Sequence, residues 1–178
     1  MTREEKTMKS EKIYEGKVIN LRVDTVELPD RKYSKREIVE HSGAVGILAI
    51  TNDDKLIFVK QFRKTIEDEL LEIPAGRIET DEIPDTTAAR ELEEETGFKS
   101  NKLKKLTAVL SSPGFSNEVI HIYLAEDLQE GTAQPDEDEY IEVIYLTLEE
   151  ALDKILKGEI RDSKTTLAVL FYKALVLG

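Results

Sequence analysis

Apolar and polar residues alternate with a period of two over much of the first forty residues. The alternation is clearest over residues 12–28 and again over 34–41, and 29–32 is a turn signal between them. Such a pattern predicts half-buried β-strands. Residues 1–10 are charged and are expected to be frayed. The sequence therefore predicts an antiparallel extension over residues 11–41.

The pattern changes near Gly43, where a mixed core is predicted to begin. Residues 44–50 form a continuous apolar run that is typical of a buried central strand. Strands and helices are then expected to mix, which indicates an α+β fold. The predicted strands after the central one are 56–62, 103–111, 119–125 and 141–146, and the predicted helices are 84–96, 148–157 and 165–177.

The first of these helices has clear end signals and follows a predicted loop over residues 75–83. Pro84 suits the first turn of a helix, and residues 85–87 can cap it. Gly97 is expected to stop the helix in the left-handed conformation that glycine adopts without strain. The prediction is a short helix with defined ends.

Composition limits the class of protein. The chain has 178 residues, 40% of them hydrophobic, which predicts one domain with a real core, with or without a small appendage. A net charge of −12 disfavours binding to nucleic acid or to anionic membranes. No cysteine, signal peptide or membrane-length apolar run occurs in the sequence. We therefore expect a soluble cytoplasmic protein.

Three carboxylates share one face of the helix predicted over residues 84–96. Glu91, Glu94 and Glu95 are spaced by three and four residues. Exposed like charges at this spacing repel by roughly 0.2–0.5 kcal/mol per pair. Divalent cations remove this penalty, and Mg²⁺ prefers oxygen ligands together with substrate phosphates. The spacing therefore favours a magnesium site.

Two neighbouring features support this site. Arg90 lies four residues before Glu94 and can orient it. Gly76 lets the backbone approach a ligand closely, so the carbonyl of Ala75 is a candidate ligand. The alternative is a solvated acidic helix face, and this interpretation is kept for Glu93.

Residues 76–98 match the pattern Gly-x5-Glu-x7-Arg-Glu-(aliphatic)-x-Glu-Glu-x-Gly-(aliphatic), with Phe98 in the last apolar position. In this the chain resembles the Nudix hydrolases, which cleave nucleoside diphosphates linked to another moiety. Residues 36–45, 59–64 and 71–76 are similar to the ADP-ribose pyrophosphatase subfamily, as is the loop 112–118 around Pro113. The likeness covers nearly all of the chain beyond residue 10.

The resemblance implies a Nudix fold, in which a mixed β-sheet is sandwiched between helices. It also implies an N-terminal antiparallel β-extension over residues 1–42 and a hydrolase domain over 43–178. Members of the subfamily typically form homodimers in which the N-terminal strands are exchanged and help to build the partner's site. We expect the same arrangement here.

The resemblance also implies roles for the box and for an acidic loop. Two or three Mg²⁺ ions, with Mn²⁺ as an alternative, are expected to be bound by Ala75 (through its carbonyl), Glu91, Glu95 and also Glu94. Outside the box, the acidic loop 136–142 corresponds to the segment that supplies the general base or a further metal ligand. Glu139 and Glu137 are the candidates, one in each role.

Substrate contacts are expected from residues outside the metal site. By resemblance these are Arg63, Arg36, Arg77, Glu118 and Pro113. A surface salt bridge is the alternative for Arg63 and the preferred interpretation for Arg36. The histidines, His41 and His121, lack metal-ligand spacing, and strand packing is expected of both; the aromatic residues Tyr145, Phe171 and Tyr172 are expected in the core.

The predicted function is Mg²⁺-dependent hydrolysis of ADP-ribose to AMP and ribose 5-phosphate. One alternative is a pyrophosphatase for another nucleotide sugar such as GDP-mannose. Another is a non-catalytic Nudix module that binds a nucleotide. Neither nucleic acid nor a membrane is expected as a partner.

Overall fold

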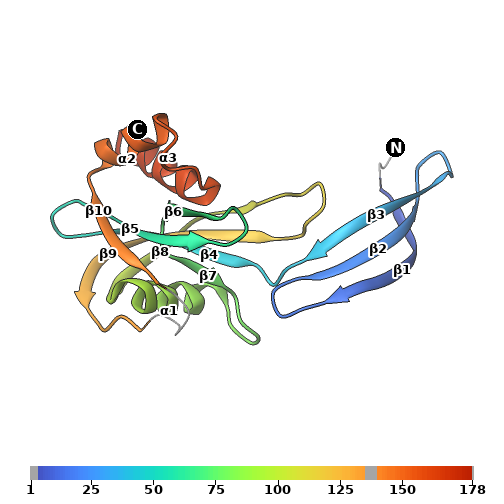
Figure 1. The fold of residues 1–178 in the computed structure, drawn as a ribbon, viewed down its shortest axis with the longest axis horizontal. Helices are drawn as coiled ribbons and strands as arrows, with labels where there is room; N and C mark the ends of the chain where they lie inside the picture. Colours follow the sequence, from blue (N-terminus) through green and yellow to red (C-terminus); the bar gives the residue numbers. More distant parts are fainter. Residues whose placement is uncertain (1–3, 135–139, 178) are drawn as a thin grey trace. The chain divides into compact units, whose positions relative to one another are not determined.

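The computed structural model describes residues 4–134 and 140–177, which divide into two units (Figure 1). The first unit comprises residues 1–43 and 109–119, and the second comprises residues 44–108 and 120–178. The predicted domain boundary after residue 42 remains a prediction, because the first unit also takes in a segment from the middle of the chain.

The first unit contains a three-stranded antiparallel sheet in the order β1-β2-β3. Its register places Glu11 opposite Val23, and Val23 opposite Glu37. The predicted antiparallel extension is therefore present. The strands are β1 (Lys6–Glu15), β2 (Asn20–Glu27) and β3 (Tyr33–Glu40).

The expected fraying of residues 1–10 is wrong for residues 6–10, which belong to β1. Lys6 pairs with Glu27 and Ser10 with Asp24. Every residue of β1 is exposed, so its sequence carries little hydrophobic signal. Backbone hydrogen bonding to β2 orders this segment, and composition alone did not reveal it.

The second unit is built on a mixed sheet in the order β10-β5-β4-β9-β8, with β6 paired to β5 and β7 paired to β4. β4 and β9 are parallel, and β4 is antiparallel to β5 and β7. The strands are β4 (Ala44–Ile50), β5 (Leu56–Arg63), β6 (Asp68–Glu72), β7 (Ala75–Arg77), β8 (Phe98–Leu110), β9 (Val119–Glu130) and β10 (Glu142–Leu146).

Helices cover both faces of this sheet. Helix α1 (Pro84–Thr96) lies on one side, and α2 (Leu148–Leu156) and α3 (Ser163–Leu177) lie on the other (Figure 1). The predicted sandwich of a mixed sheet between helices is confirmed. Under α1 the core is formed by buried apolar residues of the sheet and the helix: Val45, Ile47, Ala49, Ile57, Ala88, Leu92, Tyr123, Ala125 and Leu128.

The ends of α1 agree with the sequence except at the cap. Pro84 opens the helix, and Gly97 ends it with φ 74° while its N–H donates to the Glu93 carbonyl at 2.8 Å. The predicted capping by residues 85–87 is wrong, because the N-cap is Ile83 and makes no side-chain hydrogen bond. Instead, Asp85 accepts a hydrogen bond from the Tyr123 hydroxyl, which ties the first turn to β9.

The predicted loop over residues 75–83 begins with a short strand. Residues 75–77 form β7, and Gly76 lies opposite Val45 of the central strand. Three residues are too few to show an alternating pattern. The pairing matters for the site because it fixes the backbone of Ala75 and Gly76 to the most buried strand of the sheet.

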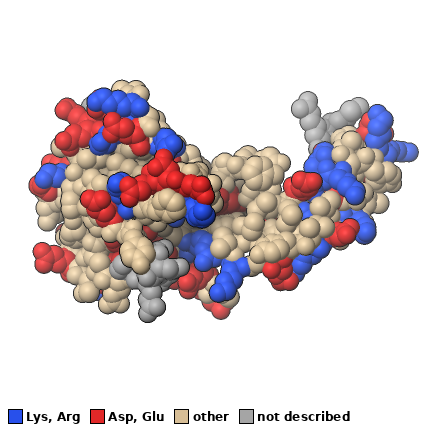
Figure 2. Space-filling view, viewed as in Figure 1, with Lys and Arg blue, Asp and Glu red and all other residues tan. Residues whose placement is uncertain are grey.

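Charged side chains of both signs are interspersed over the second unit on the face in view (Figure 2). Many form exposed ion pairs, such as Lys60–Glu69 at 2.5 Å and Lys154–Glu159 at 2.6 Å. Exposed pairs of this kind typically contribute at most about 1 kcal/mol each. Among the described residues no helix is long and apolar enough to span a membrane.

Candidate active site

The packing of α1 decides which of its side chains face the loop before it. Ala88 and Leu92 are fully buried and pack into the core beneath the helix. With this face fixed, Glu91 and Glu95 are turned toward the segment Ala75–Gly76. The predicted shared face of Glu91 and Glu95 is therefore present.

Glu95 is 4% exposed. Its Oε2 accepts a hydrogen bond from the backbone N–H of Ala75 at 2.9 Å. A buried carboxylate is tolerated only where donors or cations compensate for lost water. This hydrogen bond joins the Glu95 carboxylate to the backbone of β7, which is paired with β4.

Glu91 lies directly against Gly76. A Cβ atom on Gly76 would lie 1.8 Å from Oε1 of Glu91, so no larger residue fits without displacing the carboxylate. The glycine is needed here for close approach. The structure thus gives a physical reason for the fixed glycine of the sequence motif.

Arg90 connects the remaining carboxylates of the box. Its guanidinium donates to both oxygens of Glu82 at 2.9 and 3.0 Å, to Glu91 at 2.8 Å and to Glu94 at 2.7 Å. The predicted orientation of Glu94 by Arg90 is present. These hydrogen bonds hold three carboxylates in fixed positions despite their mutual repulsion.

The same network shifts the pKa values of its members. The hydrogen bond from Arg90 lowers the pKa of Glu82 to about 2, against the effect of burial. The pKa of Arg90 is raised, first by its hydrogen bond to Glu82 and also by the charge of Glu91. Both groups are therefore charged throughout the physiological range.

The oxygen donors of Glu91, Glu94 and Glu95 are of the type that Mg²⁺ binds. Within residues 4–134 and 140–177, no three acidic or histidine side chains lie close enough together to form a metal centre by themselves. Arg90 explains this geometry, because it draws Glu91 and Glu94 toward itself. The donor chemistry and the cradle at Gly76 fit a metal, and the assignment of ligands remains a prediction.

Arg63, the predicted substrate contact, ends strand β5 and is paired with Glu72 of β6. Its Nε and Nη2 donate to the two carboxylate oxygens of Glu72 at 2.7 and 3.0 Å. The pKa of Arg63 is raised, chiefly by this hydrogen bonding, and the charge of Glu95 also contributes. Arg63 therefore lies within electrostatic reach of the box.

The other predicted substrate residues divide between the units. Arg77 is exposed, and its carbonyl accepts a long hydrogen bond of 3.4 Å from Arg90. Arg36, Pro113 and Glu118 belong to the first unit. Arg36 forms an exposed salt bridge with Glu5 at 2.6 Å, in accord with the interpretation preferred from the sequence.

The loop around Pro113 is bound to β3 within the first unit. The Val39 N–H donates to the Phe115 carbonyl at 2.8 Å, and the His41 N–H donates to the Asn117 side chain at 2.8 Å. His41 Nδ1 in turn accepts from the Gly43 N–H at 3.0 Å and lies 3.6 Å from Glu118. His41 lies one residue past the end of β3, so the predicted strand packing is wrong for it, and its contacts instead hold the loop to the end of that strand.

Glu137 and Glu139, the candidates for the general base, lie outside the described residues. Their roles remain predictions from the resemblance.

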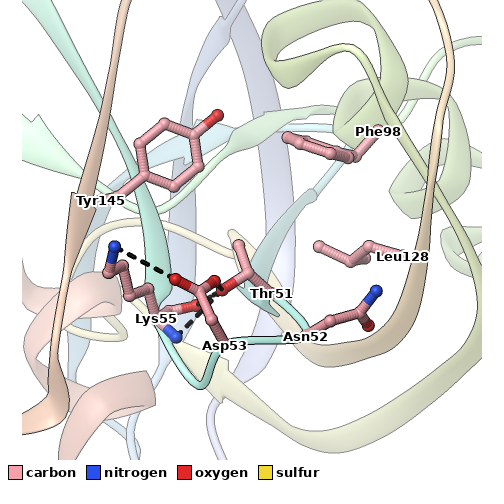
Figure 3. Close-up of a pocket in the computed structure, with 7 residues that line it drawn as sticks. All are labelled: Thr51, Asn52, Asp53, Lys55, Phe98, Leu128 and Tyr145. Atoms are coloured by element: carbon pink, nitrogen blue, oxygen red, sulfur yellow. Dashed lines mark hydrogen bonds and ion pairs between the residues drawn. The ribbon is translucent and has the colours of Figure 1, made fainter.

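A cavity of about 420 Å³ lies apart from the box carboxylates (Figure 3). Asp53 is held by Lys55 at 3.1 Å and by Thr51 at 2.6 Å on the hairpin between β4 and β5. Tyr145 faces this opening and is 45% exposed, so its predicted place in the core is wrong. Tyr145 lies on β10, at the edge of the sheet, where neighbours cover only part of a side chain.

Sequence reasoning assigned no role to three residues that support the site. Glu82 was recognised only as a fixed position, although it anchors Arg90. Glu72 stands between the apolar Leu71 and Ile73, and a charge in such a run is a signal of a buried ion pair. Lys164, its partner from α3, is 92 residues away in sequence and carries no comparable signal.

Comparison with known proteins agrees with the fold and the box. The NUDIX domain model matches residues 40–168, and the model of the nucleoside diphosphate sugar hydrolase N-terminal domain matches residues 5–39. The chain belongs to the Nudix family and is a Nudix hydrolase. A crystal structure of an ADP compounds hydrolase has the same fold, with a TM-score of 0.89 at 21% identity, covering 100% of this chain and 97% of the other.

Individual relatives show which kinds of Nudix hydrolase the chain is similar to. An ADP-ribose pyrophosphatase of Bacillus subtilis (strain 168) is 52% identical over 170 residues, covering 94% of this chain and 92% of the relative. A protein of Bacillus methanolicus named methanol dehydrogenase activator is 51% identical with the same coverage. A GDP-mannose pyrophosphatase of Cronobacter sakazakii is 34% identical and covers 75% of this chain and 74% of the relative.

Proposed function

We propose that this protein hydrolyses the pyrophosphate of ADP-ribose in the presence of Mg²⁺. The observation that supports this proposal is that Glu91 and Glu95 both lie against the segment Ala75–Gly76. The chain is a Nudix hydrolase, and one of its relatives, at 52% identity, is an ADP-ribose pyrophosphatase. The more distant GDP-mannose pyrophosphatases match less of the chain.

In the proposed reaction, the oxygen of water attacks one phosphorus and the bridging P–O bond breaks, giving AMP and ribose 5-phosphate. Ala75, Glu91, Glu94 and Glu95 would hold two or three Mg²⁺ ions, or Mn²⁺. Such ions neutralise the phosphates and lower the pKa of bound water. Arg90 holds Glu91 and Glu94 in place, and Arg63 binds the phosphates. Glu139 or Glu137 removes the proton from the attacking water.

The proposal is tested by replacing Glu95 with glutamine. The amide oxygen of Glu95→Gln can still accept the Ala75 N–H, so the fold is expected to persist. The negative charge is lost, and we expect ADP-ribose hydrolysis with Mg²⁺ to fall at least about a hundredfold, the scale on which removal of electrostatic stabilisation acts. Release of AMP and ribose 5-phosphate is measured, and circular dichroism checks the fold.

Two outcomes would contradict this proposal. Faster turnover of GDP-mannose than of ADP-ribose, in a panel of nucleotide sugars, would favour the other pyrophosphatase activity. Binding of ADP-ribose by the wild-type protein without turnover, in either Mg²⁺ or Mn²⁺, would favour a non-catalytic nucleotide-binding module.

A second candidate function is activation of a dehydrogenase. It is favoured by the relative named methanol dehydrogenase activator, whose identity nearly equals that of the pyrophosphatase relative. Adding wild-type protein and Glu95→Gln to a methanol dehydrogenase tests it. Activation by the wild-type protein alone would link the effect to hydrolysis, and activation by both would indicate a binding effect.

The protein is also proposed to act as a homodimer joined through exchanged N-terminal strands, in the cytoplasm. In support of the dimer, β1 is exposed along its whole length, and apolar residues on the first unit, among them Ile13, Tyr14 and Tyr33, are more than half exposed. Apolar area of this kind is usually covered by a partner.

A further inference from the structure

The ion pair between Arg63 and Glu72 is unusual for its uneven burial. The side chain of Glu72 is 2% exposed, whereas that of Arg63 is 37% exposed. Both carboxylate oxygens accept hydrogen bonds from Nε and Nη2 of Arg63, in the bidentate geometry that fixes the plane of a guanidinium. Within the part of the chain that the structure describes, the bonds from Arg63 to Glu72 use Nε and Nη2 and do not use Nη1.

Glu72 is itself fixed from the far end of the chain. Lys164, in the first turn of α3, donates to the same carboxylate, and its side chain is only 12% exposed. Burial opposes the charge of Glu72, but the hydrogen bond from Arg63 and the charge of Lys164 outweigh it, so the pKa of Glu72 is lowered. The carboxylate therefore stays ionised between its two cations.

The first turn of α3 is tied to the same stretch of backbone. Lys164 lies 3.1 Å from Asp162, which also accepts the Thr165 N–H at 2.9 Å. The hydroxyl of Thr165 accepts the Ile73 N–H at 2.9 Å. Lys164 and Thr165, both in the first turn of α3, thus hold Glu72 and Ile73, just before the Ala75 backbone that contacts Glu95. Asp162, the residue before the helix, in turn holds Lys164 and Thr165.

Arg63, Glu72, Asp162 and Lys164 line a cavity of about 500 Å³. Lys64 lines the same cavity, so its charged lining has three positive and two negative side chains and a net charge of only +1. What the arrangement supplies is orientation. A free arginine side chain must lose much rotational freedom to bind a phosphate, and Glu72 has already restricted it.

We infer that Glu72 is a positioning residue which, held by Lys164 and the first turn of α3, orients Arg63 toward the phosphates of the substrate. This rests on the proposed function and on the proposed contact of Arg63 with substrate. The rival explanation is an ion pair that only stabilises the fold.

The test compares Glu72→Gln with Glu69→Gln, the same substitution at an exposed position of the same strand. We expect Glu72→Gln to raise KM for ADP-ribose and lower kcat/KM by about tenfold to a hundredfold, the scale of a misplaced binding group. Glu69→Gln should leave both unchanged. In an Arg63→Gln background the Glu72 substitution should have no further effect.

Glu72→Gln removes one negative charge from the group and leaves Lys164 with Asp162 alone. The charge-balanced double variant Glu72→Gln with Lys164→Gln is therefore measured as well. The same kinetic defect is expected there if orientation is the cause. Wild-type kinetics in the folded double variant, or additive effects of the Arg63 and Glu72 substitutions, would overturn the inference.

A second readout does not depend on activity. The measurement is solvent exchange of the Arg63 Nε–H, whose signal is assigned by its loss in Arg63→Gln. Exchange should be slow in the wild-type protein and in Glu69→Gln. In the double variant it should be at least about tenfold faster, because the hydrogen bond that restricts it is gone. Unchanged exchange would overturn the positioning role. Absence of ADP-ribose turnover in the wild-type protein with slow exchange intact would instead refute the proposed function and leave the oriented Arg63 established.

Discussion

Arg90 is the residue that lets so many carboxylates occupy one face of a short helix. It is within hydrogen-bond distance of Glu82, Glu91 and Glu94, and each contact is 3.0 Å or shorter. Arginine suits this position because its planar group offers several donors in fixed directions and stays charged. A lysine could not make the same set of contacts, so the motif position has a geometric reason.

The Arg90–Glu82 contact predicts how stability depends on pH. The folded protein lowers the pKa of Glu82 from 4.5 to about 2, so the ionised form is favoured by folding. The stabilisation is then fully present above about pH 4.5 and is lost as the pH falls toward about 2. We expect the stability difference between wild-type protein and Glu82→Gln to be smaller at pH 3 than at pH 7.

Urea unfolding of both proteins at the two pH values measures this difference. Glu149→Gln, at an exposed position in the first turn of α2, is the control. A difference for Glu82→Gln that is the same at pH 3 and pH 7 would show that the carboxylate of Glu82 does not contribute through its charge.

Among the helices and strands, α1 has a defined end at a glycine but no side-chain cap at its start. The N-cap makes no side-chain hydrogen bond, whereas Gly97 adopts φ 74° and closes the helix onto Glu93. The stop also sets where β8 begins, at Phe98. The position of Glu94 and Glu95 relative to the sheet therefore depends on this turn.

Gly97→Ala and Gly158→Ala form a matched pair, because both glycines have φ +74°. A left-handed alanine costs roughly 1–2 kcal/mol at either position. At Gly97 the added Cβ would also lie 3.1 Å from the Ala133 backbone nitrogen, whereas at Gly158 it meets nothing within 4 Å. We expect Gly97→Ala to be the more destabilising of the two in chemical denaturation, and equal losses would contradict the crowding argument.

At the scale of the whole molecule, the first unit has much surface and little core. Among the described residues of its sheet, only Asp24 and Val26 are buried. A small sheet of this kind is marginal without further packing. The proposed association of two chains through these strands would supply that packing.

Sedimentation measures this expectation directly. The wild-type protein should have about twice the mass of the 20.2 kDa chain. The double variant Ile13→Asp with Tyr14→Asp places charges on exposed apolar positions of β1 and should shift the protein toward monomer. Thr7→Asp, at a polar exposed position of the same strand, is the control. A wild-type monomer would refute the dimer.

Local sequence patterns were enough to predict the strongly periodic elements and the chemistry of the box. The apolar run of β4 and the helix framed by Pro84 and Gly97 follow from local preferences, which act over a few residues. The spacing of Glu91 and Glu95 likewise fixes a shared face on any helix. These features need no information about distant parts of the chain.

The surroundings of those residues depend on long-range packing. Three features depend on sheet neighbours that lie far along the chain: the strand β7, the ordered strand structure of residues 6–10 and the exposure of Tyr145. The ion pair that joins Lys164 to Glu72 spans 92 residues. Long-range pairing of this kind leaves no periodic trace in sequence, because each partner alone is an ordinary charged residue. The box thus defined the reaction class, and the fold decided which residues hold Arg63 beside it.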